Sequence, residues 1–75
     1  MKPSIVEIFK TNISDEHLAH KIVTELNQYY SECLINFDME DCDNVLRVES
    51  QREIDVLGII AYGKENAIQI ELIDY

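Results

Sequence analysis

The order of the hydrophobic patterns constrains the fold of this chain more than any other feature. Four short segments alternate between apolar and polar residues, or are rich in strand-forming residues, as strands do. They are residues 5–10, 33–39, 45–49 and 67–73. Two segments with apolar residues three and four positions apart, which is typical of amphipathic helices, follow the first and third of these strands. The predicted order is β-α-β-β-α-β, the plan of a ferredoxin-like α+β sandwich.

This plan predicts a single domain over residues 1–75 with a four-stranded antiparallel sheet in the order 4-1-3-2. Both helices are expected on one face of the sheet. Ser14 is the expected N-cap of the first helix, since Asp15 and Glu16 follow in its first turn. The Ser50-x-x-Glu53 capping box predicts the start of the second helix, and Gly63 is its expected left-handed C-cap.

The alternation also predicts which side chains face the helices. Val6 and Ile8 are expected to point inward from the first strand, and Phe37 from the second is expected to pack against Leu26. The expected inward residues of the third strand are Leu46 and Val48. In the second helix the expected buried stripe is Ile54, Leu57, Ile60 and Ala61, with Ile59 and Tyr62 outside it.

The element lengths, and the apolar Ile13 just before the first helix, resemble the heavy-metal-associated domain of copper chaperones and metal-pumping ATPases. Residues 35–43 also look like the equivalent segment of short, stand-alone bacterial relatives of that fold. The resemblance implies the ferredoxin-like fold. The family's Met-x-Cys-x-x-Cys motif is missing, because Asp15 and Leu18 stand where its cysteines belong when Ile13 is placed on the Met. Copper-chaperone activity is therefore not implied.

Two groups of residues could bind a metal in place of the lost motif. His17 and His20 stand three positions apart on one helix, and imidazole pairs at this spacing can chelate zinc, nickel or copper. The turn between the second and third strands gathers carboxylates and a thiol. Its members are Asp38, Glu40, Asp41, Cys42 and Asp43. Solvated side chains at both places are the simpler interpretation, because a zinc site needs three or four protein ligands. We expect no tightly bound metal and no cofactor.

The sheet face opposite the helices is the more informative surface. Its predicted residues are unusually apolar for a solvated face, with Arg47 near the centre. The residues expected to form an interaction surface are Ile5, Phe9, Leu34, Val45, Arg47 and Ile73. An edge strand could also recruit another strand, including one from a second copy in a homodimer. A set of residues chosen only for strand propensity is the competing interpretation.

Charge and motifs narrow the function classes. The net charge of −9, from 15 acidic and 6 basic residues, disfavours nucleic-acid binding. No apolar run approaches the length of a membrane span, and no secretion signal precedes the first strand, so we expect a cytoplasmic protein. No nucleophile triad or phosphate-binding loop is present. The sequence predicts a non-enzymatic module that binds a protein partner or itself, and its alternative is a metal-responsive protein.

Overall fold

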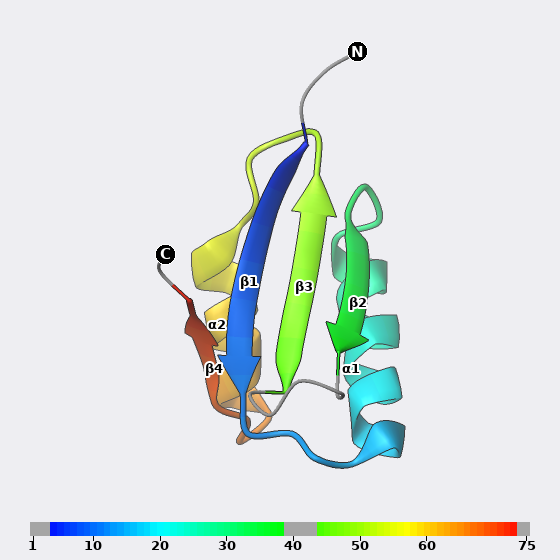
Figure 1. Cartoon of the computed structure of the whole chain (residues 1–75), viewed down its shortest axis with the longest axis vertical. Coiled ribbons are helices and arrows are strands. Elements are labelled where there is room, and N and C mark those ends of the chain that lie inside the picture. Colours follow the sequence, from blue (N-terminus) through cyan, green and yellow to red (C-terminus); the bar gives the residue numbers. More distant parts are fainter. Residues whose placement is uncertain (1–3, 39–43, 74–75) are drawn as a thin grey trace.

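The computed structural model describes residues 4–38 and 44–73. It contains six elements in the order β-α-β-β-α-β (Figure 1). They are β1 (Ile5–Thr11), α1 (Glu16–Tyr29), β2 (Leu34–Asp38), β3 (Val45–Ser50), α2 (Val56–Glu65) and β4 (Ile70–Leu72). The order of strands and helices agrees with the sequence prediction. The fourth strand is shorter than predicted, since only three residues of the segment 67–73 pair with β1.

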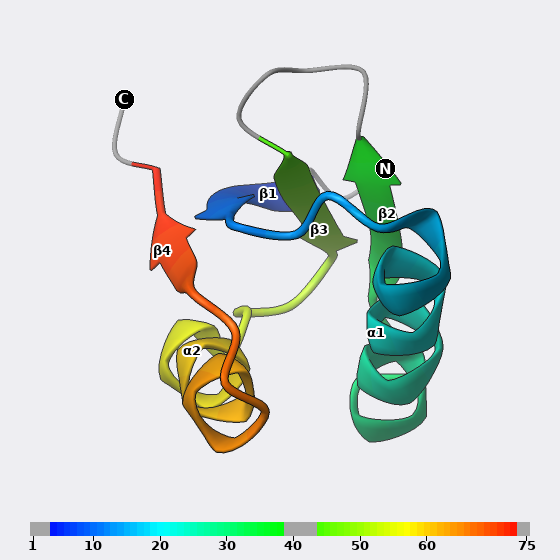
Figure 2. The same ribbon diagram turned by 90° about the horizontal axis from the view of Figure 1, so that it is seen from below.

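All strand pairs are antiparallel, and the strands lie in the order β2-β3-β1-β4, which is 4-1-3-2 when read from the β4 edge. β1 and β3 are therefore central, and β2 and β4 are edges. Both helices lie on the same side of the sheet, with α1 below β2 and α2 near β4 (Figure 2). The molecule is an α+β protein with one helix-covered sheet face, and no other described segment covers the opposite face.

Helix α1 begins one residue later than the sequence predicted. Asp15, not Ser14, is the N-cap, with extended backbone angles and a carboxylate that accepts a hydrogen bond from the His17 N–H at 2.9 Å. A side-chain oxygen at the cap satisfies one of the four N–H groups that a helix start leaves unpaired. Both residues are good caps, and Asp15 adds a negative charge at the positive end of the helix.

The predicted capping box at the start of the second helix is wrong. Ser50 belongs to β3, is buried, and accepts a hydrogen bond from the Arg52 N–H at 3.1 Å. The helix instead begins at Val56, with Asp55 as its cap accepting from the Gly58 N–H at 3.0 Å. Pairing of β3 with β1 extends to Ser50 and so removes this residue from the helix.

The register of β1 differs by one residue from the prediction. Phe9 is fully buried on the helix side of the sheet, whereas Val6 is 39% exposed on the opposite face. Both faces of β1 carry apolar residues, so alternation did not decide between them. The pairing of Phe9 with Leu46, which also has no exposed surface, fixes the observed orientation. The inward predictions for Leu46 and Val48, and for Leu26 on α1, are confirmed, and Phe37 packs against this core.

The predicted buried stripe of the second helix is only partly confirmed: Ile54 is buried and Ile60 packs against the core, but Leu57 and Ala61 are exposed. Leu57 is 80% exposed, while Ile59 is buried and Tyr62 packs against the core. Gly63 is not a left-handed cap but a buried residue inside the helix. A Cβ at Gly63 would lie 2.9 Å from the Ile68 carbonyl oxygen, so the missing side chain allows α2 to approach the segment that leads into β4.

Candidate functional site

The uncovered sheet face carries a mixed array of apolar and charged side chains. The strand register places Ile8, Arg47 and Asn36 side by side across the three strands β1, β3 and β2. Arg47 forms an ion pair with Glu49 at 3.2 Å on the same face of β3. Such a pair between partly exposed side chains contributes little stability. The face is therefore an alternating polar and apolar surface with its arginine held by a neighbouring carboxylate.

The interaction surface predicted from the sequence is only partly on this face. Leu34, which is 65% exposed, and Arg47 lie there as predicted, and Ile73 lies there opposite Ile8. Phe9 and Ile5 do not, because the observed register of β1 turns both to the helix side. Val45 lies on the outer face but is only 9% exposed. The register places Lys10 and Asp38 on either side of it.

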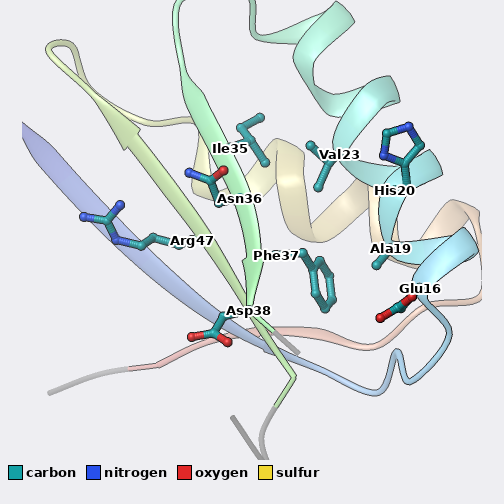
Figure 3. A pocket seen from close by; sticks show the side chains of 9 residues that line it. All are labelled: Glu16, Ala19, His20, Val23, Ile35, Asn36, Phe37, Asp38 and Arg47. Carbon is teal, nitrogen blue, oxygen red and sulfur yellow. The ribbon is translucent and has the colours of Figure 1, made fainter. Parts of the chain in front are cut away.

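A groove of about 720 Å³ runs along the edge of β2 and lies between that strand and α1. Its apolar lining consists of Ala19 and Val23 from α1 and Ile35 and Phe37 from β2. Its polar lining consists of Glu16, His20, Asn36, Asp38 and Arg47. In Figure 3 the side chain of Phe37 lies on the α1 side of β2, while Asn36, Asp38 and Arg47 lie on the other side. The groove thus wraps around the outer edge of the strand.

Local sequence explains why these side chains meet. Ile35 and Phe37 point to one side of β2 and Asn36 and Asp38 to the other, because successive residues of a strand alternate. On α1, Glu16, His20 and Val23 recur at four- and three-residue spacing, so they lie on one helical surface. His17 does not line the groove although it is on the same helix. Of the residues selected from the sequence, His20, Asp38 and Arg47 come together here.

Hydrogen bonds between the two helices hold α1 in place beside β2. The Tyr30 hydroxyl, just after α1, donates to the Asp55 carboxylate at 3.0 Å, and the Tyr62 hydroxyl of α2 donates to Glu25 of α1 at 2.8 Å. A Cβ at Gly58 would lie 2.7 Å from the Asp55 carboxyl carbon, so glycine leaves room for this arrangement. The helix that forms one wall of the groove is therefore fixed at its C-terminal half.

Burial, followed by the hydrogen bond to Asp55 and its negative charge, raises the pKa of Tyr30 to about 12. The pKa of Tyr62 is also raised, first by burial and then by Glu25. Both hydroxyls are consequently protonated donors at neutral pH. Burial raises the pKa of the Cys33 thiol too, against an opposing hydrogen bond with Ser50, which gives an unreactive core thiol.

Two further grooves lie toward the β4 edge of the sheet. One, of about 450 Å³, lies along β4 and is lined mainly by apolar residues, including Ile60, Ile68 and Leu72. The other, of about 530 Å³, lies where Ile5 and Glu7 of β1 extend beyond the short strand β4. Glu7 lines this groove and is only partly buried, which explains how its carboxylate is tolerated on the helix side of β1.

No group of three or more His, Cys, Asp or Glu residues is placed to hold a metal ion within residues 4–38 and 44–73. His17 and His20 are both exposed on α1. Asp38 is exposed at the end of β2, and the remaining members of the acidic turn lie outside the described residues. These are Glu40, Asp41, Cys42 and Asp43.

Sequence reasoning overlooked most of the groove lining, including Glu16, Val23 and Ile35. The signal that could have identified them is β2 itself, whose sequence Leu-Ile-Asn-Phe-Asp contains no Lys or Pro. Edge strands usually carry such residues to prevent pairing with another chain. An edge strand whose one charged residue, Asp38, lies at its end is a candidate binding site when it runs beside an amphipathic helix.

Comparison with protein-family models, with curated proteins and with solved structures gives no match. Within the described residues, no helix is both long and apolar enough to cross a membrane.

Proposed function

We propose that this protein is a non-enzymatic binding module whose binding site is the groove between the edge of β2 and α1. The observation that supports it is the combination of an edge strand and an adjoining groove of about 720 Å³. The lining joins an apolar floor, which includes Ala19, Val23 and Phe37, with five polar residues, so it offers both apolar contacts and hydrogen-bonding groups to a partner.

The β2 groove is favoured over the other surfaces for two reasons. β2 has five residues against three in β4, so it offers a longer edge. The groove along β2 is also larger than the one along β4. The outer sheet face adjoins it through Asn36 and Arg47, so a partner in the groove could extend onto this face.

We further propose that the fold is ferredoxin-like and that the chain is a distant relative of the heavy-metal-associated domains. The element order and the four-stranded antiparallel sheet support this proposal. At the positions of the family's two cysteines, Asp15 caps α1 and Leu18 is 38% exposed. A carboxylate and an aliphatic side chain thus replace the two thiolate ligands of the family. We therefore propose that this chain shares the fold of these domains but binds its partner at a different surface.

Selection of binders from a random peptide library on the purified protein tests the binding function. Selected peptides are added to labelled protein, and amide chemical shifts are followed by NMR. We expect the largest shifts in Leu34–Asp38 and in the first half of α1, which line the groove. His20→Trp should weaken these peptides by about tenfold or more, because a larger side chain at the rim narrows the groove.

His17→Trp is the matched control. It makes the same change at an exposed position of the same helix, three residues away and outside the groove. Equal weakening by both variants, or shifts confined to β4 or to the outer sheet face, would contradict the β2 groove as the binding site. Binders recovered only when zinc or copper is present would favour the metal-responsive alternative.

A further inference from the structure

The edge of β2 presents main-chain hydrogen-bonding groups beside the groove. The Ile73 N–H donates a hydrogen bond to the Ile8 carbonyl at 2.8 Å, so the main-chain groups of Ile8 point toward β4. In an antiparallel strand the direction of the main-chain groups alternates from one residue to the next, so those of Phe9 point toward β3, where the register partner of Phe9 is Leu46. The main-chain N–H and C=O of Leu46 therefore point toward β1 and not toward β2.

The same alternation sets the direction of the main chain in β2. Phe37 is the partner of Leu46 across β2 and β3, so its N–H and C=O point away from β3. Ile35, the partner of Val48, is oriented in the same way. No strand within the described residues pairs with this edge of β2. Two residues thus offer their donors and acceptors at the groove, which is the geometry that an added strand requires.

A strand added at this edge would meet two different environments. Its side chains on the helix side would contact Val23, Ala19 and Phe37, which are apolar. The polar residues Glu16 and His20 of α1 line the groove on the same side. Those on the opposite side would lie near Asn36 and Asp38. The occupant therefore needs an alternating pattern, with apolar residues facing α1 and polar residues facing outward.

Charge indicates the polar residues of the occupant. Two carboxylates, Glu16 and Asp38, line the groove, and its one arginine, Arg47, already forms an ion pair with Glu49 at 3.2 Å. The whole chain carries a net charge of −9. A second copy of the chain would bring like charges together, whereas a cationic segment would be attracted at long range.

We propose, building on the proposed binding function, that the occupant of the β2 groove is an extended cationic segment of another protein, in which apolar residues alternate with Lys or Arg. It adds to the sheet as a further strand along β2. Main-chain hydrogen bonds to Ile35 and Phe37 supply affinity. Apolar contacts with α1 supply specificity, and the cationic side chains are attracted to Asp38 on the outward side of β2 and, at longer range, to Glu16 on α1.

The test uses labelled peptides of about eight residues, long enough to span β2. One peptide alternates Val and Lys, a second alternates Val and Glu, and a third alternates Ser and Lys. Fluorescence anisotropy at low and moderate salt gives the affinities, and NMR gives the location. We expect the Val/Lys peptide to bind at least about tenfold more tightly than either control, and to weaken as salt is added. Its amide shifts should be centred on Ile35 and Phe37.

Two charge-matched variants test the location of the attraction. His20→Lys and His17→Lys change the net charge equally, but only His20 lines the groove. We expect His20→Lys to weaken the Val/Lys peptide about fivefold or more, because the added cation lies on the α1 wall of the groove and repels the cationic peptide at close range. His17→Lys should weaken it less than about twofold, because position 17 lies outside the groove.

Several results would overturn the proposal. They are equal affinity for the Val/Glu peptide, equal effects of the two lysine variants, and sedimentation showing that a second copy occupies the edge. If the peptide library yields groove binders of another chemistry, the cationic segment is wrong and the binding function stands. If no peptide of any kind binds in the groove, both proposals fail.

Discussion

Truncation of Phe9 to alanine is the sharpest test of the observed register of β1. Phe9 has no exposed surface and belongs to the core cluster that also contains Leu46 and Leu26. Replacing a buried phenylalanine by alanine removes the packed ring and leaves a cavity, which costs about 3–5 kcal/mol. A chain of 75 residues is expected to have a free energy of unfolding of about 4–11 kcal/mol. The substitution should therefore remove a large part of the total stability.

Ile8→Ala is the matched control, since Ile8 is the next residue of the same strand and lies on the partly exposed outer face. Its loss should cost about 1–2 kcal/mol, because the side chain is only partly removed from water. Phe9→Glu should unfold the protein, since the core offers no partner for a buried carboxylate. If Phe9 pointed outward, as the sequence predicted, the same substitution would leave the fold intact.

Urea unfolding followed by circular dichroism measures these differences, with equal denaturant slopes as the check that the comparison is valid. Thermal unfolding should show a fall of at least about 12 °C for Phe9→Ala. If Ile8→Ala costs as much as Phe9→Ala or more, the strand is displaced by one residue and the predicted inward set of Val6 and Ile8 is the true one.

Three further predictions concern pH, a close contact and metals. The pKa of Tyr30 is 10.0 in the unfolded chain and about 12 in the folded protein. The contribution of Tyr30 to the free energy of unfolding should therefore be fully present below pH 10 and be lost as the pH rises from 10 to about 12. The urea midpoint of Tyr30→Phe should fall less over this pH range. Gly63→Ala should lower the free energy of unfolding by about 1 kcal/mol, because crowding against the Ile68 carbonyl outweighs the gain in helix propensity. Competition titration with a chromophoric chelator should detect no one-to-one copper(I) or zinc complex.

Each of these predictions has a contradicting result. An unfolding midpoint that stays constant from neutral pH to pH values above 10 would mean that the Tyr30 hydroxyl is neither buried nor held by Asp55. A Gly63→Ala variant more stable than the wild type would mean that α2 can move away from Ile68. A stoichiometric metal complex that is lost in His17→Ala or Cys42→Ser would favour the metal-responsive alternative.

The hydrophobic periodicity predicted the buried face correctly in those strands and helices where polar residues mark the opposite face. The alternation in β2 and β3 placed Ile35, Leu46 and Val48 inward, because the opposite face of each strand carries charged or amide side chains. The stripe on α1 likewise predicted Ile22 and Leu26 as core residues. In these segments the polar residues exclude the alternative orientation.

Local patterns failed where both orientations were apolar. β1 carries Val6 and Ile8 on one face and Ile5 and Phe9 on the other, so pairing with β3 decided the outcome. In α2 nearly every residue is apolar, and the close approach at Gly63 selected Ile59 as the buried face.

The sequence by itself determined the number, type and order of the elements, because these depend on hydrophobic periodicity and turn residues close together in the chain. Tertiary structure alone decided the β2 groove. Its walls come from Glu16 to Val23 and from Ile35 to Asp38, with Arg47 added from β3. No single segment contains the groove, since it exists only where strand pairing leaves an edge open beside a packed helix. That juxtaposition depends on the long-range contacts that place β2 at the edge of the sheet above α1.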